Sequence, residues 1–361
     1  MKNFLSSIKR FVMSFIYKCT NLFHVKNTSS ASSQQKAHFL AKFFSNKLKN
    51  FLNANIDTGL HNFYRGNILE AKLYFKLMNI LFPCSAVIKY NIARCYFALG
   101  NTNMAYNYFI KTLRLDKNCN EALYYIKKIK NPISIKFIPN NLIRQYFNNT
   151  GGYFVEHWLI SKQYRGHEYV YIGVVSIFNN DHLSDLKILD LGCGTGVCGH
   201  FLKINCIGSY AVGIDISSRM LNVARGCFVN NKPVYNELIN ISLREFLGRK
   251  KCEQYDVIIF SEVLHYVYDF EYELRLSRNF LSNKGAVICL VRRKKDKGKN
   301  KGVDFINKGD YFCHSEHYIR CVAEKISMEI SYMSYCKIYG SQVDGILFIL
   351  QFKKSELKAK E

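Results

Sequence analysis

The stretch LKILDLGCGTGVCG, residues 186–199, constrains the fold more than any other part of the sequence. An apolar, strand-forming run leads directly into four glycines within eight residues, which is typical of a strand that turns into a helix around a bound nucleotide. Two kinds of ligand fit this turn. Gly194, Gly196 and Gly199 match the G-x-G-x-x-G spacing of dinucleotide sites, whereas Asp190, just ahead of the turn, favours a nucleoside of another kind.

Further short β-rich runs follow at intervals that leave room for helices. They are YAVGID (210–215), YDVIIF (255–260) and AVICLV (286–291), and helical patterns separate them. Such alternation predicts a parallel sheet covered by helices, a Rossmann-like α/β domain. Two last runs, at 328–339 and 345–352, have no helix between them, so the sheet is expected to end in an antiparallel strand pair.

The chain ahead of this domain contains an internal repeat. Residues 64–83 and 97–117 superpose at an offset of 34 residues, which places Gly66 on Gly100, Ala71 on Ala105 and Phe75 on Phe109. This region resembles tetratricopeptide repeats, whose period is that length. The resemblance implies an all-α domain with capping helices near 36–55 and 120–129, and a binding groove for a protein or peptide partner. An ordinary pair of helical hairpins is the alternative.

These patterns predict five segments. Residues 1–35 form a basic amphipathic leader and polar tether, 36–129 the helical repeats, 130–142 a linker, 143–354 the α/β domain and 355–361 a charged tail. The uncharged run between Arg10 and Lys18 is too short to span a bilayer, so the leader is expected at most to touch a membrane surface.

Composition places the protein in a reducing compartment. Thirteen cysteines are scattered with no C-x-x-C pair, as is usual for reduced thiols, and we therefore expect a cytoplasmic protein. The formal net charge of +24 is compatible with nucleic acid but does not require it, because lysine is abundant in a chain that is also rich in Asn, Ile, Phe and Tyr.

Asp190 decides between the two ligands. A carboxylate ahead of the glycine turn would repel a pyrophosphate, and a cofactor with a cationic end and no phosphate removes this conflict. In order along the chain, LDLGCGTG, VGIDIS and YDVIIFSEVLHY resemble the class I S-adenosylmethionine-dependent methyltransferases. With the repeats included, residues 56–353 resemble bacterial predicted methyltransferases that carry tetratricopeptide repeats in front.

The resemblance implies S-adenosylmethionine as the cofactor and assigns its contacts. Asp190 faces the ammonium end of the donor, Asp215 holds the ribose hydroxyls, and Ser242 stands where the family often has an acid for the adenine amino group. The full set of implied cofactor-binding residues is Asp190, Gly192, Cys193, Gly194, Gly196, Asp215, Ile216, Met220, Ser242, Leu243, Ser261 and Glu262.

Two histidines are the candidate catalytic residues. His265 follows the fourth strand at the carboxyl edge of the sheet, and its ordinary pKa suits a general base; His314 lies in the segment HSEHY. Cys313, His314 and His317 have no second ligand pair at finger-like spacing, so we predict no metal site.

Absent motifs narrow the acceptor. No Asn/Asp-Pro-Pro-aromatic tetrapeptide follows the fourth strand, which disfavours amino-methylation of a flipped base. No Pro-Cys nucleophile follows it either, which disfavours methylation at a pyrimidine carbon through a cysteine adduct. The basic run 292–302 can attract an anionic acceptor or form a solvated loop. We expect transfer to an O or N atom of a small molecule or protein. An inactive nucleoside-binding scaffold and an NAD-dependent oxidoreductase are the rival hypotheses.

Overall fold

The computed structural model describes residues 46, 50–151, 155–178, 180–250, 253–295 and 302–353. The predicted leader, tether and charged tail lie outside these residues, as does part of the basic run after residue 295. The chain divides into two compact units, Met1–Ile129 and Lys130–Glu361. Among the described residues, no helix combines the length and the apolar character needed to cross a bilayer.

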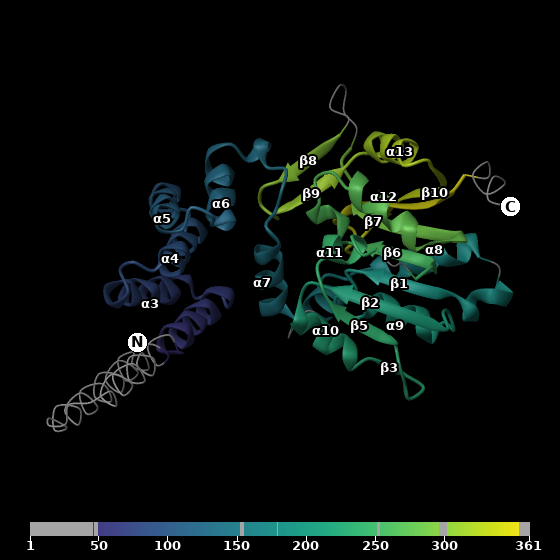
Figure 1. Ribbon diagram of the computed structural model, residues 1–361, viewed down its shortest axis with the longest axis horizontal. Coiled ribbons are helices and arrows are strands. Elements are labelled where there is room, and N and C mark those ends of the chain that lie inside the picture. The colour runs from purple at the N-terminus through teal and green to yellow at the C-terminus, as the bar shows by residue number, and fades with distance from the viewer. Residues whose placement is uncertain are drawn as a thin grey trace, which may run out of the picture. The chain divides into compact units, whose positions relative to one another are not determined.

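The first unit is helical. Residues 50–64 form a helix, and four more follow: α3 (Ile68–Leu81), α4 (Ala86–Ala98), α5 (Thr102–Leu115) and α6 (Asn120–Lys130) (Figure 1). Ser85 and Asn101 cap α4 and α5, because their side chains accept hydrogen bonds from the backbone amides of Ile88 and Met104. The residues between 36 and 49, where we predicted most of a capping helix, lie outside the described part of the chain except residue 46.

The residues that defined the sequence repeat occupy matching places in this unit. Ala71 and Ala105 have no exposed surface, and neither do Phe75 and Phe109 one turn later. Gly66 and Gly100 have φ angles of 84° and 78°, in the left-handed region that favours glycine after a helix. Each alanine–phenylalanine pair therefore forms part of the core at the same point of its hairpin.

The second unit begins with several helical segments. They are η1 (Pro132–Ser134), α7 (Asn140–Thr150), the π-helical turn η2 (Val155–Ser161), α8 (Gly166–Ile177) and η3 (Asn180–Asp185). Pro132 opens η1 and Pro139 immediately precedes α7, since proline needs no amide partner at the start of a helix. Part of the segment that we predicted as a linker therefore belongs to α7.

A seven-stranded sheet follows, in the order β10-β11-β7-β6-β1-β2-β5. Neighbours among β1, β2, β5, β6 and β7 pair in parallel, whereas β11 runs antiparallel to both β7 and β10. This arrangement confirms the predicted parallel sheet with an antiparallel strand pair at its end. The bounds are β1 (Lys187–Leu191), β2 (Tyr210–Asp215), β5 (Glu237–Asn240), β6 (Tyr255–Ser261), β7 (Leu281–Arg292), β10 (Met328–Lys337) and β11 (Asp344–Phe352).

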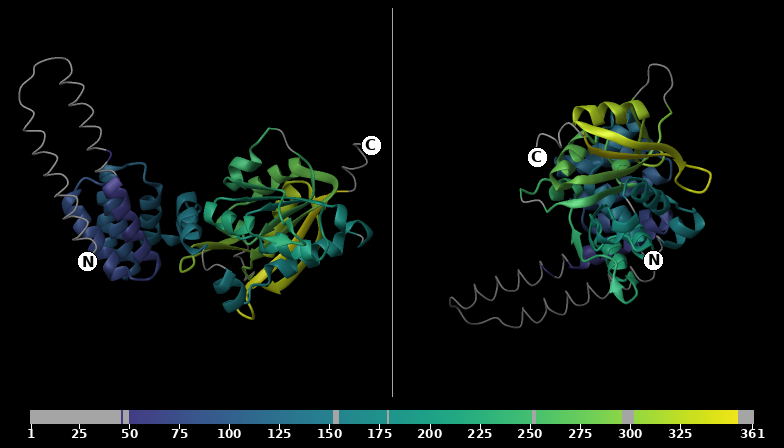
Figure 2. Two further views of the ribbon diagram at one scale, coloured as in Figure 1. Left: turned by 90° about the horizontal axis from the view of Figure 1, so that it is seen from below. Right: turned by 90° about the vertical axis from the view of Figure 1, so that its right-hand side faces the viewer.

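Helices cover both faces of the sheet, as Figure 2 shows for this unit. One apolar core lies under α8, α9 (Val197–Ile204) and α10 (Ser218–Arg225), and the other lies under α11 (Leu243–Leu247), α12 (Glu271–Ser277) and α13 (Glu316–Lys325). Ile188 faces the first core and Leu189 the second, since successive side chains of a strand alternate. Strands β1 and β6 are buried over most of their length, which explains the apolar runs in the sequence.

Two hairpins were not predicted. The first joins β3 (Phe228–Val229) and β4 (Lys232–Pro233); the second joins β8 (Val303–Ile306) and β9 (Tyr311–His314) beyond the basic run. Two short 3-10 turns, η4 (Leu264–Tyr266) and η5 (Arg278–Phe280), complete the unit. Because β1, β2, β5, β6 and β7 are parallel, their carboxyl ends meet at one edge of the sheet, and there the candidate site lies.

Candidate active site

The glycine turn after β1 is fixed by its backbone. Gly192, Gly194 and Gly196 have φ angles of 82°, 55° and 84°, which only glycine adopts readily. The amides of Gly192 and Cys193 both donate to the carbonyl of Ile214 in β2, at 2.9 Å each. The turn therefore lies against the neighbouring strand, with α9 starting directly after Gly196.

The remaining glycines of the region make room for Tyr235. A Cβ atom on Gly199 would lie 2.4 Å from the Tyr235 hydroxyl, and one on Gly213 would lie 3.0 Å from its ring. Tyr235 is 5% exposed and donates a hydrogen bond of 2.7 Å to Asp190. Gly199, which completed the dinucleotide pattern in the sequence, thus has a packing role in this fold.

Asp190 lies beneath the turn and is 1% exposed. Burial raises the pKa of its carboxyl group from 3.8 to about 7, although the hydrogen bond from Tyr235 opposes the rise. The nearby Asp215 carboxylate adds to the increase. Near neutral pH this carboxyl group is therefore only partly ionised, and the repulsion of a pyrophosphate is weaker than the sequence alone indicated.

Asp215 ends β2 and is partly exposed. Its two carboxylate oxygens accept hydrogen bonds from different amides, Oδ2 from Gly194 at 3.0 Å and Oδ1 from Ser217 at 2.7 Å. Burial raises its pKa to about 6 even so. Each oxygen keeps a further lone pair, so the carboxylate can still accept a pair of ribose hydroxyl groups.

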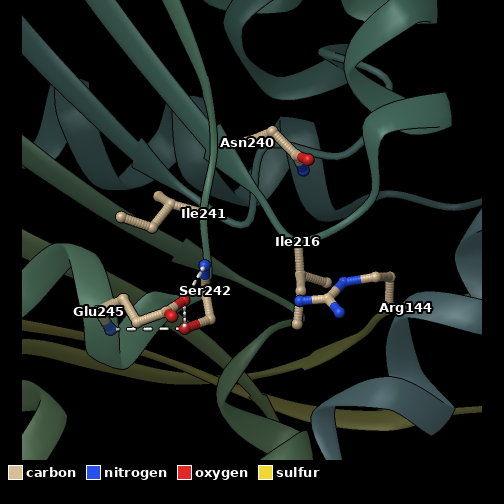
Figure 3. A pocket seen from close by; sticks show the side chains of 6 residues that line it. All are labelled: Arg144, Ile216, Asn240, Ile241, Ser242 and Glu245. Carbon is tan, nitrogen blue, oxygen red and sulfur yellow. Dashed lines mark hydrogen bonds between the residues drawn. The ribbon is translucent and has the colours of Figure 1, made fainter. Parts of the chain in front are cut away.

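A cavity of about 330 Å³ lies beyond the tips of β2 and β5 (Figure 3). Of the predicted cofactor-binding residues, Ile216 and Ser242 line it. Met220 is instead 1% exposed within α10, and Leu243 packs against the core. The cavity is lined by Arg144, Ile216, Asn240, Ile241, Ser242 and Glu245.

The hydroxyl of Ser242 is already engaged in capping α11. It accepts a hydrogen bond from the Glu245 amide and donates one to the Glu245 carboxylate, while the Ser242 amide donates to the same carboxylate at 3.1 Å. These hydrogen bonds lower the pKa of Glu245. A carboxylate therefore lines this cavity three residues after Ser242, and the S-x-x-E capping pattern at 242–245 is the signal that would have found it.

Arg144 reaches the same cavity from α7, ahead of the sheet. This helix is held to the site by a hydrogen bond of 2.7 Å from the Ser217 hydroxyl to Asn148. No sequence pattern pointed to Arg144, because its place depends on how α7 docks.

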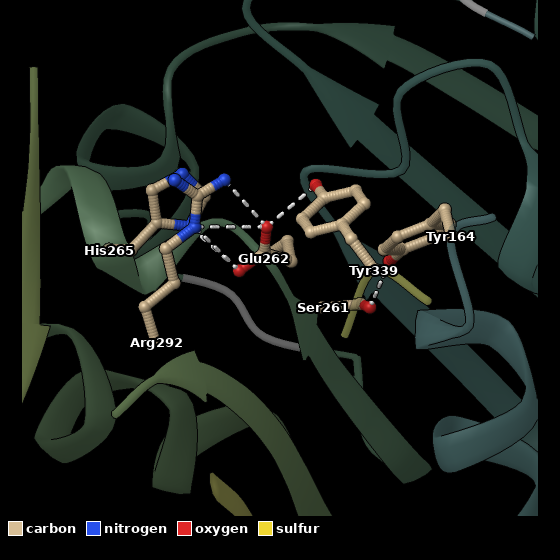
Figure 4. Close-up of polar contacts among 6 residues, drawn as sticks. All are labelled: Tyr164, Ser261, Glu262, His265, Arg292 and Tyr339. Carbon is tan, nitrogen blue, oxygen red and sulfur yellow. Dashed lines mark hydrogen bonds and ion pairs between the residues drawn. The ribbon is translucent and has the colours of Figure 1, made fainter. Parts of the chain in front are cut away.

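Glu262 forms the centre of a buried polar network at the tip of β6 (Figure 4). Its carboxylate accepts hydrogen bonds from Arg292 at 2.9 Å and from the Tyr339 hydroxyl at 2.8 Å, and it lies 3.4 Å from Nδ1 of His265. Burial opposes ionisation, but the positive charge and the hydrogen bonds of Arg292 outweigh it and hold the pKa of Glu262 well below its usual range. Glu262 also has a φ of 55°, a strained value for a residue other than glycine.

His265 is 2% exposed and packs beside the rings of Tyr266 and Tyr311. Burial lowers its pKa, so the ring is neutral at pH 7. Among the described residues, neither ring nitrogen has a hydrogen-bond partner, and Nδ1 lies 3.4 Å from the Glu262 carboxylate. A buried, unpaired imidazole nitrogen beside an ionised carboxylate is costly, which is typical of a functional site.

Ser261 lies at the same edge of the sheet, together with three residues that we did not predict as site residues: Tyr164, Arg292 and Tyr339. The hydroxyl groups of Ser261 and Tyr164 lie 2.9 Å apart. Arg292 belonged to the basic run in the sequence, yet it is the last residue of β7 and its guanidinium group lies 4.0 Å from the ring centre of Tyr311. Tyr164 and Tyr339 come from segments far away along the chain and carried no local signal.

His314, the second predicted catalytic residue, has polar contacts outside the Glu262 network. It has no exposed surface, and its Nε2 lies 3.0 and 3.2 Å from the carbonyl oxygens of Val267 and Tyr268. Burial lowers its pKa to about 3. Its Nε2 thus faces the backbone beneath the turn after η4, while Nδ1 has no hydrogen-bond partner among the described residues, and the catalytic role of His314 stays a prediction. Among the described residues, no group of three His, Cys, Asp or Glu side chains is arranged to hold a metal ion.

Comparison with known families indicates which class of enzyme this part of the chain resembles. Residues 189–287 match the family model described as a methyltransferase domain. This segment is a methyltransferase domain. The matched residues include the glycine turn, Asp215, the Ser242 cap, Glu262 and His265. The cofactor of the domain is S-adenosylmethionine, as predicted.

Several solved structures are similar to the methyltransferase domain and its flanking segments. Magnesium protoporphyrin IX methyltransferase from Synechocystis PCC 6803 is 17% identical, covers 60% of this chain and 100% of its own, and has a TM-score of 0.45. The 1,6-didemethyltoxoflavin-N1-methyltransferase from Burkholderia thailandensis is 9% identical, with 62% and 94% covered and a TM-score of 0.47. A methyltransferase from Clostridium acetobutylicum is 15% identical, with 57% and 98% covered and a TM-score of 0.39. No curated protein sequence matches the chain.

Proposed function

We propose that this protein transfers a methyl group from S-adenosylmethionine to an O or N atom of a small-molecule or protein acceptor. The observation that carries the proposal is the Glu262–His265 pair at the tip of β6, next to the glycine turn. S-adenosylmethionine supplies a methyl group that its sulfonium already activates, so the protein chiefly has to position the two reactants and accept a proton.

The residues around the cavity fit the donor. The carboxylate of Asp215 can accept hydrogen bonds from the ribose hydroxyls, and the carboxylate of Glu245 can accept one from the adenine amino group. Ile216 offers an apolar surface to the adenine ring. Asp190, when ionised, favours the cationic amino-acid end of the donor from beneath the turn.

His265 is the proposed general base. The Glu262 carboxylate near Nδ1 favours the tautomer with its proton on that nitrogen, which leaves the lone pair of Nε2 to accept a proton from the acceptor. Arg292 and Tyr339 keep Glu262 ionised and fixed in place. Because His265 is buried, we expect the turn η4 to move when the acceptor binds.

Transfer of a labelled methyl group tests this proposal. Full-length protein is incubated with S-adenosylmethionine labelled in the methyl group and with size-fractionated cell extract, and the labelled fraction is identified. We expect wild-type protein to label one fraction and His265→Ala to lose most of this activity while still binding donor. His182→Ala serves as a control, because His182 lies at the surface with its side chain 78% exposed.

Two other outcomes distinguish the rival hypotheses. Binding of the donor without transfer to any fraction would make the protein a nucleoside-binding scaffold. Binding of NADH in place of the donor would make it an oxidoreductase.

For the helical unit we propose tetratricopeptide repeats that bind a protein or peptide partner. Support comes from the matching burial of Ala71 with Ala105 and of Phe75 with Phe109, and from a repeat of the known length. We also propose a cytoplasmic protein, since the cysteines in the described part of the chain are free thiols.

A further inference from the structure

Two tyrosines and three lysines form a compact patch on the helical unit. Tyr96 of α4 and Tyr108 of α5 stack with ring centres 5.6 Å apart and an interplanar angle of 26°. The ammonium groups of Lys72 and Lys76, on α3, lie 5.3 and 5.4 Å from the centre of the Tyr96 ring, and that of Lys111 lies 4.8 Å from the centre of the Tyr108 ring. We call these five residues the lysine–tyrosine patch; Figure 1 labels the three helices that carry it.

The patch is positively charged and accessible. Lys76 and Lys111 are exposed, and Lys72 is partly exposed. In the part of the chain that the structure describes, none of these three ammonium groups forms an ion pair with a carboxylate. An exposed cation–π contact is weaker than a good ion pair in a partly desolvated interface. The fold thus gathers three like charges without neutralising them.

The stacked rings discriminate between two kinds of anionic partner. Nucleic acids bind to such surfaces by stacking bases on open aromatic faces. Here one face of Tyr96 is occupied by Tyr108, lysine ammonium groups lie near both rings, and Tyr96 is only 8% exposed. What the patch offers a partner is therefore a set of ammonium groups at the ends of ordered side chains, which suits carboxylates.

We propose that the lysine–tyrosine patch binds an acidic segment of a partner protein, through Asp or Glu carboxylates that pair with Lys72, Lys76 and Lys111. This inference rests on the proposed partner-binding role of the helical unit and does not depend on methyl transfer. It specifies the face that binds and the chemistry that the partner carries.

Charge reversal in the full-length protein tests the patch. The probe is a fluorescein-labelled decapeptide of glutamate, and its binding is measured by fluorescence anisotropy. Because a chain with a net charge of +24 attracts any polyanion, the variant K72E/K76E/K111E is compared with a matched control of equal charge, R65E/K117E/K127E, whose three sites are also exposed. We expect at least tenfold weaker binding for the patch variant and less than threefold for the control.

Three results would overturn the inference. They are equal loss of affinity in both variants, no binding of the peptide to wild type, and tighter binding of a decathymidine oligonucleotide that the patch variant alone abolishes. Circular dichroism confirms that both variants fold. The labelled-methyl assay on the same preparations is expected to be unchanged, so failure of the patch and failure of the proposed enzyme are separate outcomes.

Discussion

The buried carboxyl group of Asp190 makes a quantitative prediction about stability. In the folded protein its pKa is raised to about 7 by burial, whereas in the unfolded chain it takes its ordinary value of 3.8. The substitution Asp190→Asn removes this ionisation and keeps an oxygen that can accept the hydrogen bond from Tyr235. The pH dependence of the difference between the two proteins therefore isolates the carboxyl group.

The sign and size of the effect on the free energy of unfolding follow from the linkage between proton binding and folding. Because the folded pKa is the higher one, the folded state holds the proton more tightly, so the contribution to stability is fully present below pH 3.8 and is lost as the pH rises through about 7. A rise of about three pKa units, at about 1.36 kcal/mol each, corresponds to about 4 kcal/mol. Between pH 4 and pH 8 the variant should gain about this much relative to wild type.

Urea unfolding followed by the fluorescence of Trp158, the one tryptophan of the sequence, measures this difference at several pH values. Asp185→Asn is the control, since the Asp185 side chain is 76% exposed and should show no such trend. A constant difference between Asp190→Asn and wild type from pH 4 to pH 8 would refute the reasoning, because it would mean that Asp190 ionises alike in both states.

Three further predictions concern the site. Asp215→Asn should weaken binding of S-adenosylhomocysteine at least tenfold by calorimetry, since the amide cannot accept two ribose hydroxyls as a carboxylate does. An unchanged affinity would show that Asp215 does not bind the ribose. Gly199→Ala should destabilise the domain by about 1–3 kcal/mol, because the added Cβ would lie 2.4 Å from the Tyr235 hydroxyl and 2.5 Å from Cζ of its ring; an unchanged temperature of thermal unfolding would contradict this. Arg292→Met should cost about 3–5 kcal/mol of unfolding free energy because it leaves Glu262 charged and buried, and pairing it with Glu262→Gln should restore most of the stability; equal losses in the single and double variants would show that the ion pair is not the cause.

Sequence patterns predicted those parts of the molecule that depend on local chemistry. The apolar strands and the glycine turn after β1 are local features. Asp215 could be predicted as a site residue because it ends the next strand. The antiparallel end of the sheet was predictable since two strands without a helix between them have to reverse direction.

The rest of the site depends on contacts between distant residues. Tyr235 reaches Asp190 across 45 positions of the chain, and this contact both buries the carboxyl group and gives Gly199 and Gly213 their packing role. Tyr339 reaches Glu262 across 77 positions. Glu245, which lines the cavity beyond β5, did not depend on a distant contact. It could have been predicted from the capping pattern that starts at Ser242.

Calorimetric titration of the full-length protein with S-adenosylmethionine, and separately with NAD⁺, tests the central claim most directly. We predict that S-adenosylmethionine binds at one site per chain and that NAD⁺ gives no heat of binding at the same concentrations. Saturable binding of NAD⁺ that S-adenosylmethionine does not displace, with no heat from S-adenosylmethionine alone, would contradict the account.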